Sequence, residues 1–118
     1  MDVGAKLQIK PGQRVATVAG PGEIPAVAPA GAQTASPDAA DVVVAFVRTR
    51  AELDTVAAPA LDAARRDKLA WIAYPKAGKL GTDLNRDILR ETLADRGVQP
   101  VRQVAIDDVW SALRFRPA

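Results

Sequence analysis

Two continuous apolar runs constrain the fold of this chain more than any other feature of its sequence. Val42–Val47 reads VVVAFV and Leu69–Tyr74 reads LAWIAY, and neither run alternates with polar residues. A strand that is apolar at every position is typical of the centre of a parallel sheet, where both faces are covered. We therefore expect the two runs to be adjacent parallel strands at the centre of one sheet.

The segment between the runs predicts a connecting helix over Arg50–Arg66. Its apolar positions recur at spacings of three and four residues: Leu53, Val56, Ala57, Ala60, Leu61 and Ala64. That spacing forms one buried stripe along a helix. Thr49 is expected to cap the helix start, with Glu52 completing a capping box. Pro59 interrupts the pattern, and it either kinks this helix or begins a second one in its first turn.

The segment before the first run predicts one strand followed by a long loop. Val15 and Val18 give β character to Gln13–Ala19, which glycine and proline residues bound on both sides. Residues 21–40 hold four prolines and many alanines without a helical period. This proline- and alanine-rich stretch is expected to be an irregular loop, with at most a short strand near Ala26–Ala28.

The residues after the second run predict a helix and a hairpin. Thr82 is expected to cap a helix over Asp83–Arg96, which Gly97 ends. Two strands joined by an acidic turn at Asp107-Asp108 follow. Strands that alternate with helices predict a single α/β domain over residues 1–118. Its expected architecture is a small three-layer Rossmann-like fold, with a mostly parallel sheet that ends in an antiparallel hairpin strand.

The composition restricts the chemistry and the location that this chain can have. It contains no Cys and no His, which excludes disulfides and thiol catalysis and removes the commonest general base and metal ligand. No metal site is expected. The N-terminus lacks a basic region followed by an apolar core, and no apolar run approaches a membrane span in length. We therefore expect a cytoplasmic protein without a membrane partner.

The charge of the chain is unevenly distributed between its two halves. Residues 1–64 hold five basic and seven acidic side chains, whereas residues 65–118 hold eleven basic and seven acidic ones. The basic half could face an anionic ligand or a nucleic-acid backbone, or it could be an ordinary mixed surface. Because there is no dense run of Lys and Arg, and aromatic residues are few, a nucleic-acid partner is not the favoured one.

The end of the second apolar run carries the candidate site. Ligands of open α/β sheets bind beyond the carboxyl ends of the strands. Tyr74 ends this strand, and Lys76, Lys79, Thr82 and Asp83 follow it closely. The two lysines could converge on an anion near a helix N-terminus, and the tyrosine could donate a hydrogen bond. The alternative is that the lysines are solvated loop charges on an ordinary strand-to-helix connection.

Three further features each allow a functional and a structural interpretation. Asp83 and Asp87 share one helix face and could hold a cation or act as acid and base, although such pairs are typical of exposed faces. Trp110 is expected in the core rather than as a stacking platform. Arg114 and Arg116 share a strand face with Trp110, so they could form an interaction stripe or pack their stems over its ring.

Several segments resemble a family of short bacterial proteins known only as a domain of unknown function. The similar segments are KPGQRV, ADVVVAFVRTRAEL, WIAYPK, TDLNRD and VRQVAIDDVWSALRFRP. They cover most of Leu7 to Pro117 apart from the proline-rich loop. The resemblance implies a shortened class I methyltransferase core, in which a parallel sheet ends in a hairpin strand. It implies no activity.

The cofactor site of such a fold is matched only in part. It requires a glycine-rich turn that runs from the first strand into a helix, and an acidic residue at the end of the second strand. Gly20 and Gly22 flank a proline, and no helix is expected after them. We therefore expect no cofactor, and a non-catalytic domain that binds a small anionic ligand or a partner protein. The alternatives are an S-adenosylmethionine-dependent methyltransferase with a degraded cofactor loop and an RNA-binding protein.

Overall fold

The two apolar runs form the centre of one sheet, as the sequence predicts. The computed structural model describes residues 3–20, 22–28, 31–76 and 78–118. In it β3 (Val42–Phe46) and β4 (Leu69–Pro75) are adjacent and parallel. Every residue of β3 is buried, and so is every residue of β4 after Leu69. Continuous apolar sequence therefore corresponds to burial on both faces, as expected for central strands.

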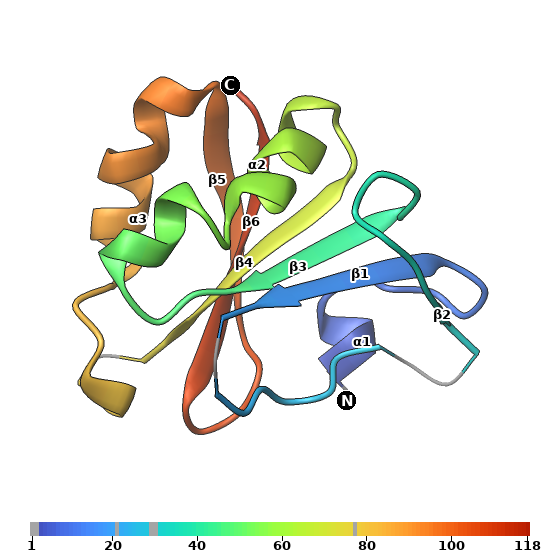
Figure 1. Ribbon diagram of the computed structural model, residues 1–118, viewed down its shortest axis with the longest axis horizontal. Coiled ribbons are helices and arrows are strands. Elements are labelled where there is room, and N and C mark those ends of the chain that lie inside the picture. The colour runs from blue at the N-terminus through green and yellow to red at the C-terminus, as the bar shows by residue number, and fades with distance from the viewer. Residues whose placement is uncertain (1–2, 21, 29–30, 77) are drawn as a thin grey trace.

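The complete sheet has six strands in the order β2-β1-β3-β4-β6-β5 (Figure 1). β1 (Arg14–Ala19) is parallel to β3, and the two-residue β2 (Gln33–Thr34) is parallel to β1. β6 (Trp110–Pro117) is antiparallel to both of its neighbours, β4 and β5 (Val98–Ala105). The α/β class and the antiparallel hairpin strand are thus confirmed, and the sheet is mixed. The last strand of the hairpin lies inside the sheet, and the first forms its edge.

The helical segments cover the two faces of the sheet unequally. They are α1 (Val3–Lys6), η1 (Arg50–Asp54), α2 (Ala58–Arg65), η2 (Lys79–Gly81), α3 (Arg86–Leu93) and η3 (Ala94–Arg96). Helices α2 and α3 lie on one face, and the short α1 lies on the other (Figure 1). None of the helices in the described segments reaches the length and hydropathy that crossing a bilayer requires.

Two apolar clusters fill the spaces on either side of the sheet. The cluster beneath α2 and α3 is built mainly from Ala, Val and Leu, because aromatic residues are scarce. The opposite cluster contains Phe46, Trp71 and Trp110. The rings of Phe46 and Trp110 meet edge to face with centroids 5.1 Å apart, a favourable geometry for an aromatic pair. The expectation that Trp110 is a core residue is confirmed.

The connection from β3 to β4 differs from the single helix that the sequence predicts. It divides into η1 and α2, and Pro59 lies in the first turn of α2, where its missing N–H has no helical partner to lose. Of the two alternatives for Pro59, the second is confirmed. The expected cap is wrong, because the Thr49 side chain makes no capping hydrogen bond. The Glu52 carboxylate instead accepts a hydrogen bond of 2.6 Å from the backbone N–H of Arg48.

The predicted start of the second helix, at Asp83, is also wrong. α3 begins at Arg86, and the Asn85 side chain caps it by accepting a hydrogen bond of 2.8 Å from the N–H of Ile88. Asn85 is as good a cap as Thr82, so the sequence did not separate the two positions. The predicted end is confirmed: Gly97 follows η3 in the left-handed conformation, with a φ of 79°.

The proline- and alanine-rich segment contributes little regular structure. Residues 26–28 form no strand, which corrects the expectation there, and the only short strand described between residues 22 and 40 is β2. Val27 is buried against the face that α1 covers. The segment thus takes the place of a helix on this face, since its apolar side chains close the cluster around Trp71. Pro21, Pro29 and Ala30 lie outside the described residues.

Candidate functional site

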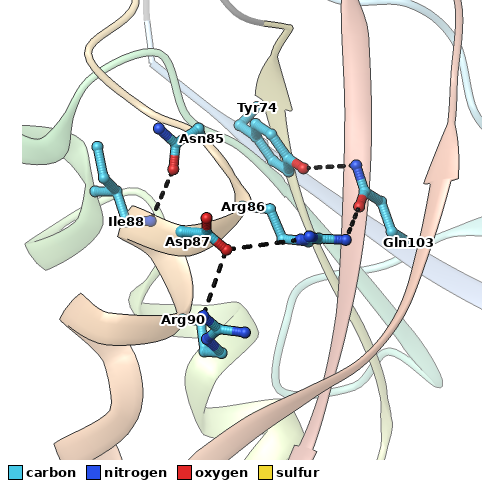
Figure 2. A network of polar contacts seen from close by, with 7 residues as sticks. All are labelled: Tyr74, Asn85, Arg86, Asp87, Ile88, Arg90 and Gln103. Atoms are coloured by element: carbon cyan, nitrogen blue, oxygen red, sulfur yellow. Dashed lines mark hydrogen bonds and ion pairs between the residues drawn. The ribbon is translucent and has the colours of Figure 1, made fainter.

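A cleft of about 470 Å³ lies beyond the carboxyl end of β4. It opens between the strand end, the start of α3 and the hairpin strands (Figure 2). Its lining residues are Tyr74, Lys76, Asn85, Arg86, Asp87, Gln103 and Ser111. The position agrees with the rule that ligands of open α/β sheets bind at the carboxyl ends of strands. The volume lies within the range of small-molecule sites, about 300–1,000 Å³.

Tyr74 supplies a hydrogen-bonding group to the inner wall of the cleft. The residue is buried on the face that α3 covers, and its phenol oxygen accepts a hydrogen bond of 3.1 Å from the Gln103 amide (Figure 2). Burial raises the pKa of the Tyr74 phenol, and the carboxylate of Asp87 adds to this effect, whereas Arg86 opposes it. The phenol therefore stays protonated at neutral pH and keeps its O–H available to donate to a ligand.

Positive charge predominates around the mouth of the cleft. The Arg86 guanidinium makes only long contacts, 3.4 Å to Gln103 Oε1 and 3.9 Å to Asp87 Oδ1 (Figure 2). Asp87 Oδ1 also pairs with Arg90 at 3.4 Å. Within the part of the chain that the structure describes, the Lys76 ammonium has no hydrogen-bond or ion-pair partner. Two arginines thus share one carboxylate beside this unpaired lysine, and exposed pairs of this kind contribute little to folding.

Of the five residues expected to bind a ligand, the structure brings two into the cleft. Tyr74 and Lys76 line it, whereas Lys79, Thr82 and Asp83 are not among its lining residues. Lys79 is exposed in η2. The proposed convergence of Lys76 and Lys79 on one anion stays a prediction, since it concerns a ligand that no described contact reports.

Thr82 and Asp83 bind the loop that follows β3. The Thr82 hydroxyl donates to the carbonyl oxygen of Arg48 at 2.7 Å and accepts from the N–H of Leu84 at 3.0 Å. The Asp83 carboxylate accepts a hydrogen bond of 2.9 Å from the backbone N–H of Arg50. These two side chains therefore join the loops at the ends of β3 and β4, and they fix the position of the residues that line the cleft.

Replacement of Thr82 by valine is expected to lower the free energy of unfolding by about 1–2 kcal/mol. Valine has a similar volume but leaves both the Arg48 carbonyl and the Leu84 N–H without their partner. Urea unfolding followed by circular dichroism measures the difference. Thr82→Ser, which keeps the hydroxyl, is the control, and a valine variant as stable as the serine variant would contradict this role.

Sequence reasoning missed most of the residues that complete the cleft. Arg86 and Asn85 were passed over because they were expected inside a helix that began earlier. Ser111 of β6 is paired with Tyr74 of the neighbouring strand β4. Gln103 of β5 donates a hydrogen bond to the Tyr74 hydroxyl. Nothing in the local sequence marks either one. The hairpin is the one sequence feature that could indicate these two residues, and only if its second strand is assumed to pair with β4.

The glycine turn after β1 is packed by side chains of the same chain. A methyl group at Gly20 would overlap the carboxylate of Glu52. At Gly22, where φ is 114°, a methyl group would lie 2.7 Å from Nη2 of Arg48. Arg48 Nη2 also donates a hydrogen bond of 2.6 Å to the carbonyl oxygen of Glu23. The absence of side chains at both glycines is thus explained by two internal contacts.

The Arg48 guanidinium also lies over Trp110, with 5.2 Å between its central carbon and the ring centroid. This is a cation–π contact. The guanidinium groups of Arg114 and Arg116 have other partners. Arg114 donates a hydrogen bond to Gln8 at 2.9 Å, and Arg116 pairs with Asp67 at 3.2 Å. The arginine that stacks on Trp110 is therefore Arg48, which follows β3.

The acidic residues do not gather into a site. Asp83 accepts from the Arg50 backbone and Asp87 pairs with Arg90, so the two carboxylates have separate partners. Asp107 accepts hydrogen bonds from the N–H groups of Val109 and Trp110, which is the turn role expected of it. Among the described residues, no three potential metal ligands lie close enough together to hold an ion.

Comparisons with known proteins do not extend this description. A scan against protein-family models, a search of curated proteins and a search of solved structures each found no match. The resemblance to a bacterial family of unknown function stays a prediction. The chemistry of the cleft is accordingly the basis for assigning a function.

Proposed function

We propose that this protein is a non-catalytic binding domain that holds a small anionic ligand in the cleft beyond β4. The observation that carries the proposal is that Lys76 and Arg86 line the cleft with a single carboxylate, Asp87, which also pairs with Arg90, beside a protonated Tyr74. An anion would replace the long contacts of Arg86 with shorter, charge-assisted hydrogen bonds. The cations of this cleft are available because little in the fold depends on them.

The ligand would be bound by donors from the end of β4 and from the start of α3. Lys76 at the end of β4 supplies a mobile ammonium, and Arg86 at the start of α3 supplies a fork of N–H groups suited to phosphate or carboxylate. The Tyr74 O–H completes the set from the buried side. The N-terminal turn of α3 adds a favourable dipole at the same place.

The strand order supports a second proposal, that the fold is a shortened methyltransferase-like one. Four neighbouring strands, β2, β1, β3 and β4, are parallel, and the antiparallel β6 follows them before the edge strand β5. This is the parallel sheet with a terminal hairpin that the family resemblance implies. We propose the Rossmann-like fold on this basis, with a thin third layer formed by α1 and the irregular segment around Val27.

The packing of the glycine turn supports a domain that does not use the methyltransferase cofactor. Glu52 and Arg48 occupy the space next to Gly20 and Gly22 that a cofactor would need, and residues 22–28, the described segment after the turn, form no helix to present its N–H groups. Calorimetric titration with about 0.5 mM S-adenosylmethionine, a level that detects affinities of roughly −5 kcal/mol, is expected to show no binding. A micromolar isotherm would restore the transferase alternative.

Titration with inorganic phosphate tests the anion site directly. Arg86→Ala is expected to raise the dissociation constant about tenfold, equivalent to ~1.4 kcal/mol, and Lys76→Ala to raise it severalfold. Lys79→Ala is the matched control, because it removes an exposed lysine of the same loop that does not line the cleft. Binding that depends on Lys79 as strongly as on Arg86 would move the site to the paired lysines. Absence of phosphate binding to the parent protein would refute the proposal.

A further inference from the structure

A second cleft adjoins the first and adds three apolar residues to a charged lining. Its volume is about 410 Å³, and it shares Arg86 and Gln103 with the first cleft. Beyond these, one side carries Arg90 of α3 and the other carries Pro100, Val101 and Arg102 of β5, with Leu113 also lining it. A ligand bound in the first cleft could extend past Arg86 into this space without leaving the protein surface.

Val101 gives the second cleft an exposed apolar wall. It is 48% exposed, and among the described residues only Leu80 is another large apolar side chain exposed to this degree. The β5–β6 register shifts between Pro100 and Arg102, so Val101 is the extra residue of a β-bulge and has no partner on β6. Bulges re-aim side chains, and this one places a valine on the sheet edge beside the cleft.

The two walls together match the body of an organic anion. Guanidinium groups stack on flat apolar or aromatic groups, and the opposite apolar wall excludes water from such a group. Inorganic phosphate would use neither wall. Every lining residue of the first cleft carries a polar or charged group, whereas Pro100, Val101 and Leu113 of the second cleft do not.

We propose that the second cleft is a subsite for the flat apolar body of an organic phosphate, and that Val101 determines this specificity. The inference rests on the proposed function, because the phosphate group of the same molecule occupies the first cleft beside Lys76 and Arg86. Arg86, which lines both clefts, lies where the phosphate joins the body.

Phenyl phosphate and inorganic phosphate are the probes, titrated into the complete protein by calorimetry. Phenyl phosphate is expected to bind about tenfold more tightly, since burying part of a phenyl ring at roughly 25 cal/mol per Å² is more than sufficient for that gain. Val101→Ser is expected to abolish the gain while leaving the affinity for inorganic phosphate unchanged. Leu80→Ser removes the other exposed apolar side chain and is expected to change neither affinity.

The outcomes separate this inference from the function on which it rests. If neither probe binds, the anion site itself is wrong and the subsite falls with it. If both bind equally well to the parent protein, the anion site stands and the subsite is wrong. If the preference for phenyl phosphate persists in Val101→Ser, or is lost in Leu80→Ser, the apolar body lies elsewhere and the assignment to Val101 is overturned.

Discussion

Replacement of Trp71 by alanine is expected to lower the free energy of unfolding by about 3–5 kcal/mol, the largest effect of any single substitution considered for this protein. Trp71 lies on the central strand β4 and is 0% exposed. Its indole N–H donates a buried hydrogen bond of 3.0 Å to the carbonyl oxygen of Leu7. Alanine would therefore leave a large cavity in the aromatic cluster and would also detach the segment that follows α1.

Trp71→Phe separates the two contributions. Phenylalanine keeps much of the apolar volume but cannot donate to Leu7, so a loss of about 1–2 kcal/mol is expected. Urea unfolding monitored by far-ultraviolet circular dichroism gives both values. If the alanine variant were no less stable than the phenylalanine variant, the cluster around Trp71 would not be the tightly packed core described above.

Gly20→Ala is expected to destabilise the protein by about 2 kcal/mol, even though the backbone of Gly20 does not adopt a positive φ. The added methyl group would overlap the Glu52 carboxylate, which accepts a hydrogen bond from the N–H of Arg48. The carboxylate would have to move away, and the N–H would lose its partner. A glycine kept only to admit a cofactor would tolerate alanine without any loss of stability.

A double-mutant cycle with Glu52→Ala tests this cause. Glu52→Ala alone removes the same hydrogen bond and is expected to cost about 1–2 kcal/mol. Once the carboxylate is gone, the alanine at position 20 should cost less than ~0.5 kcal/mol, so the two changes should be strongly non-additive. Additive effects of the two substitutions, measured by urea unfolding, would show that the glycine has another role.

The centre of the fold could be predicted from the sequence because its signal is local and strong. Each apolar run is long enough to fill a buried strand, and the stripe between them has a clear helical period. Helix boundaries were less predictable, because competing caps lie within a few residues of each other. Asn85 and not Thr82 caps the helix, because the Thr82 hydroxyl is hydrogen-bonded to Arg48 and Leu84. These contacts exist only in the folded chain.

The candidate site could be predicted only where it follows a strand directly. Tyr74 and Lys76 could be predicted because the first ends an apolar run and the second closely follows it, at the end of the sheet where ligands bind. Gln103 and Ser111 come from a hairpin that returns to the sheet, so their proximity depends on a register that local sequence does not specify. The role of Val101 could not be predicted for a similar reason, because a bulge depends on how two strands pair.

The insertion of β6 between β4 and β5 has a consequence for synthesis on the ribosome. One side of β4 can pair with β3 as soon as Pro75 has emerged, but its other side must wait for Trp110. At ~5–20 residues per second, the intervening chain takes roughly 2–7 s to translate. During this interval a strand that is apolar on both faces presents unpaired N–H and C=O groups, which is a template for aggregation. A nascent chain that stalls before Trp110 therefore keeps that edge open and becomes a substrate for chaperones or proteases.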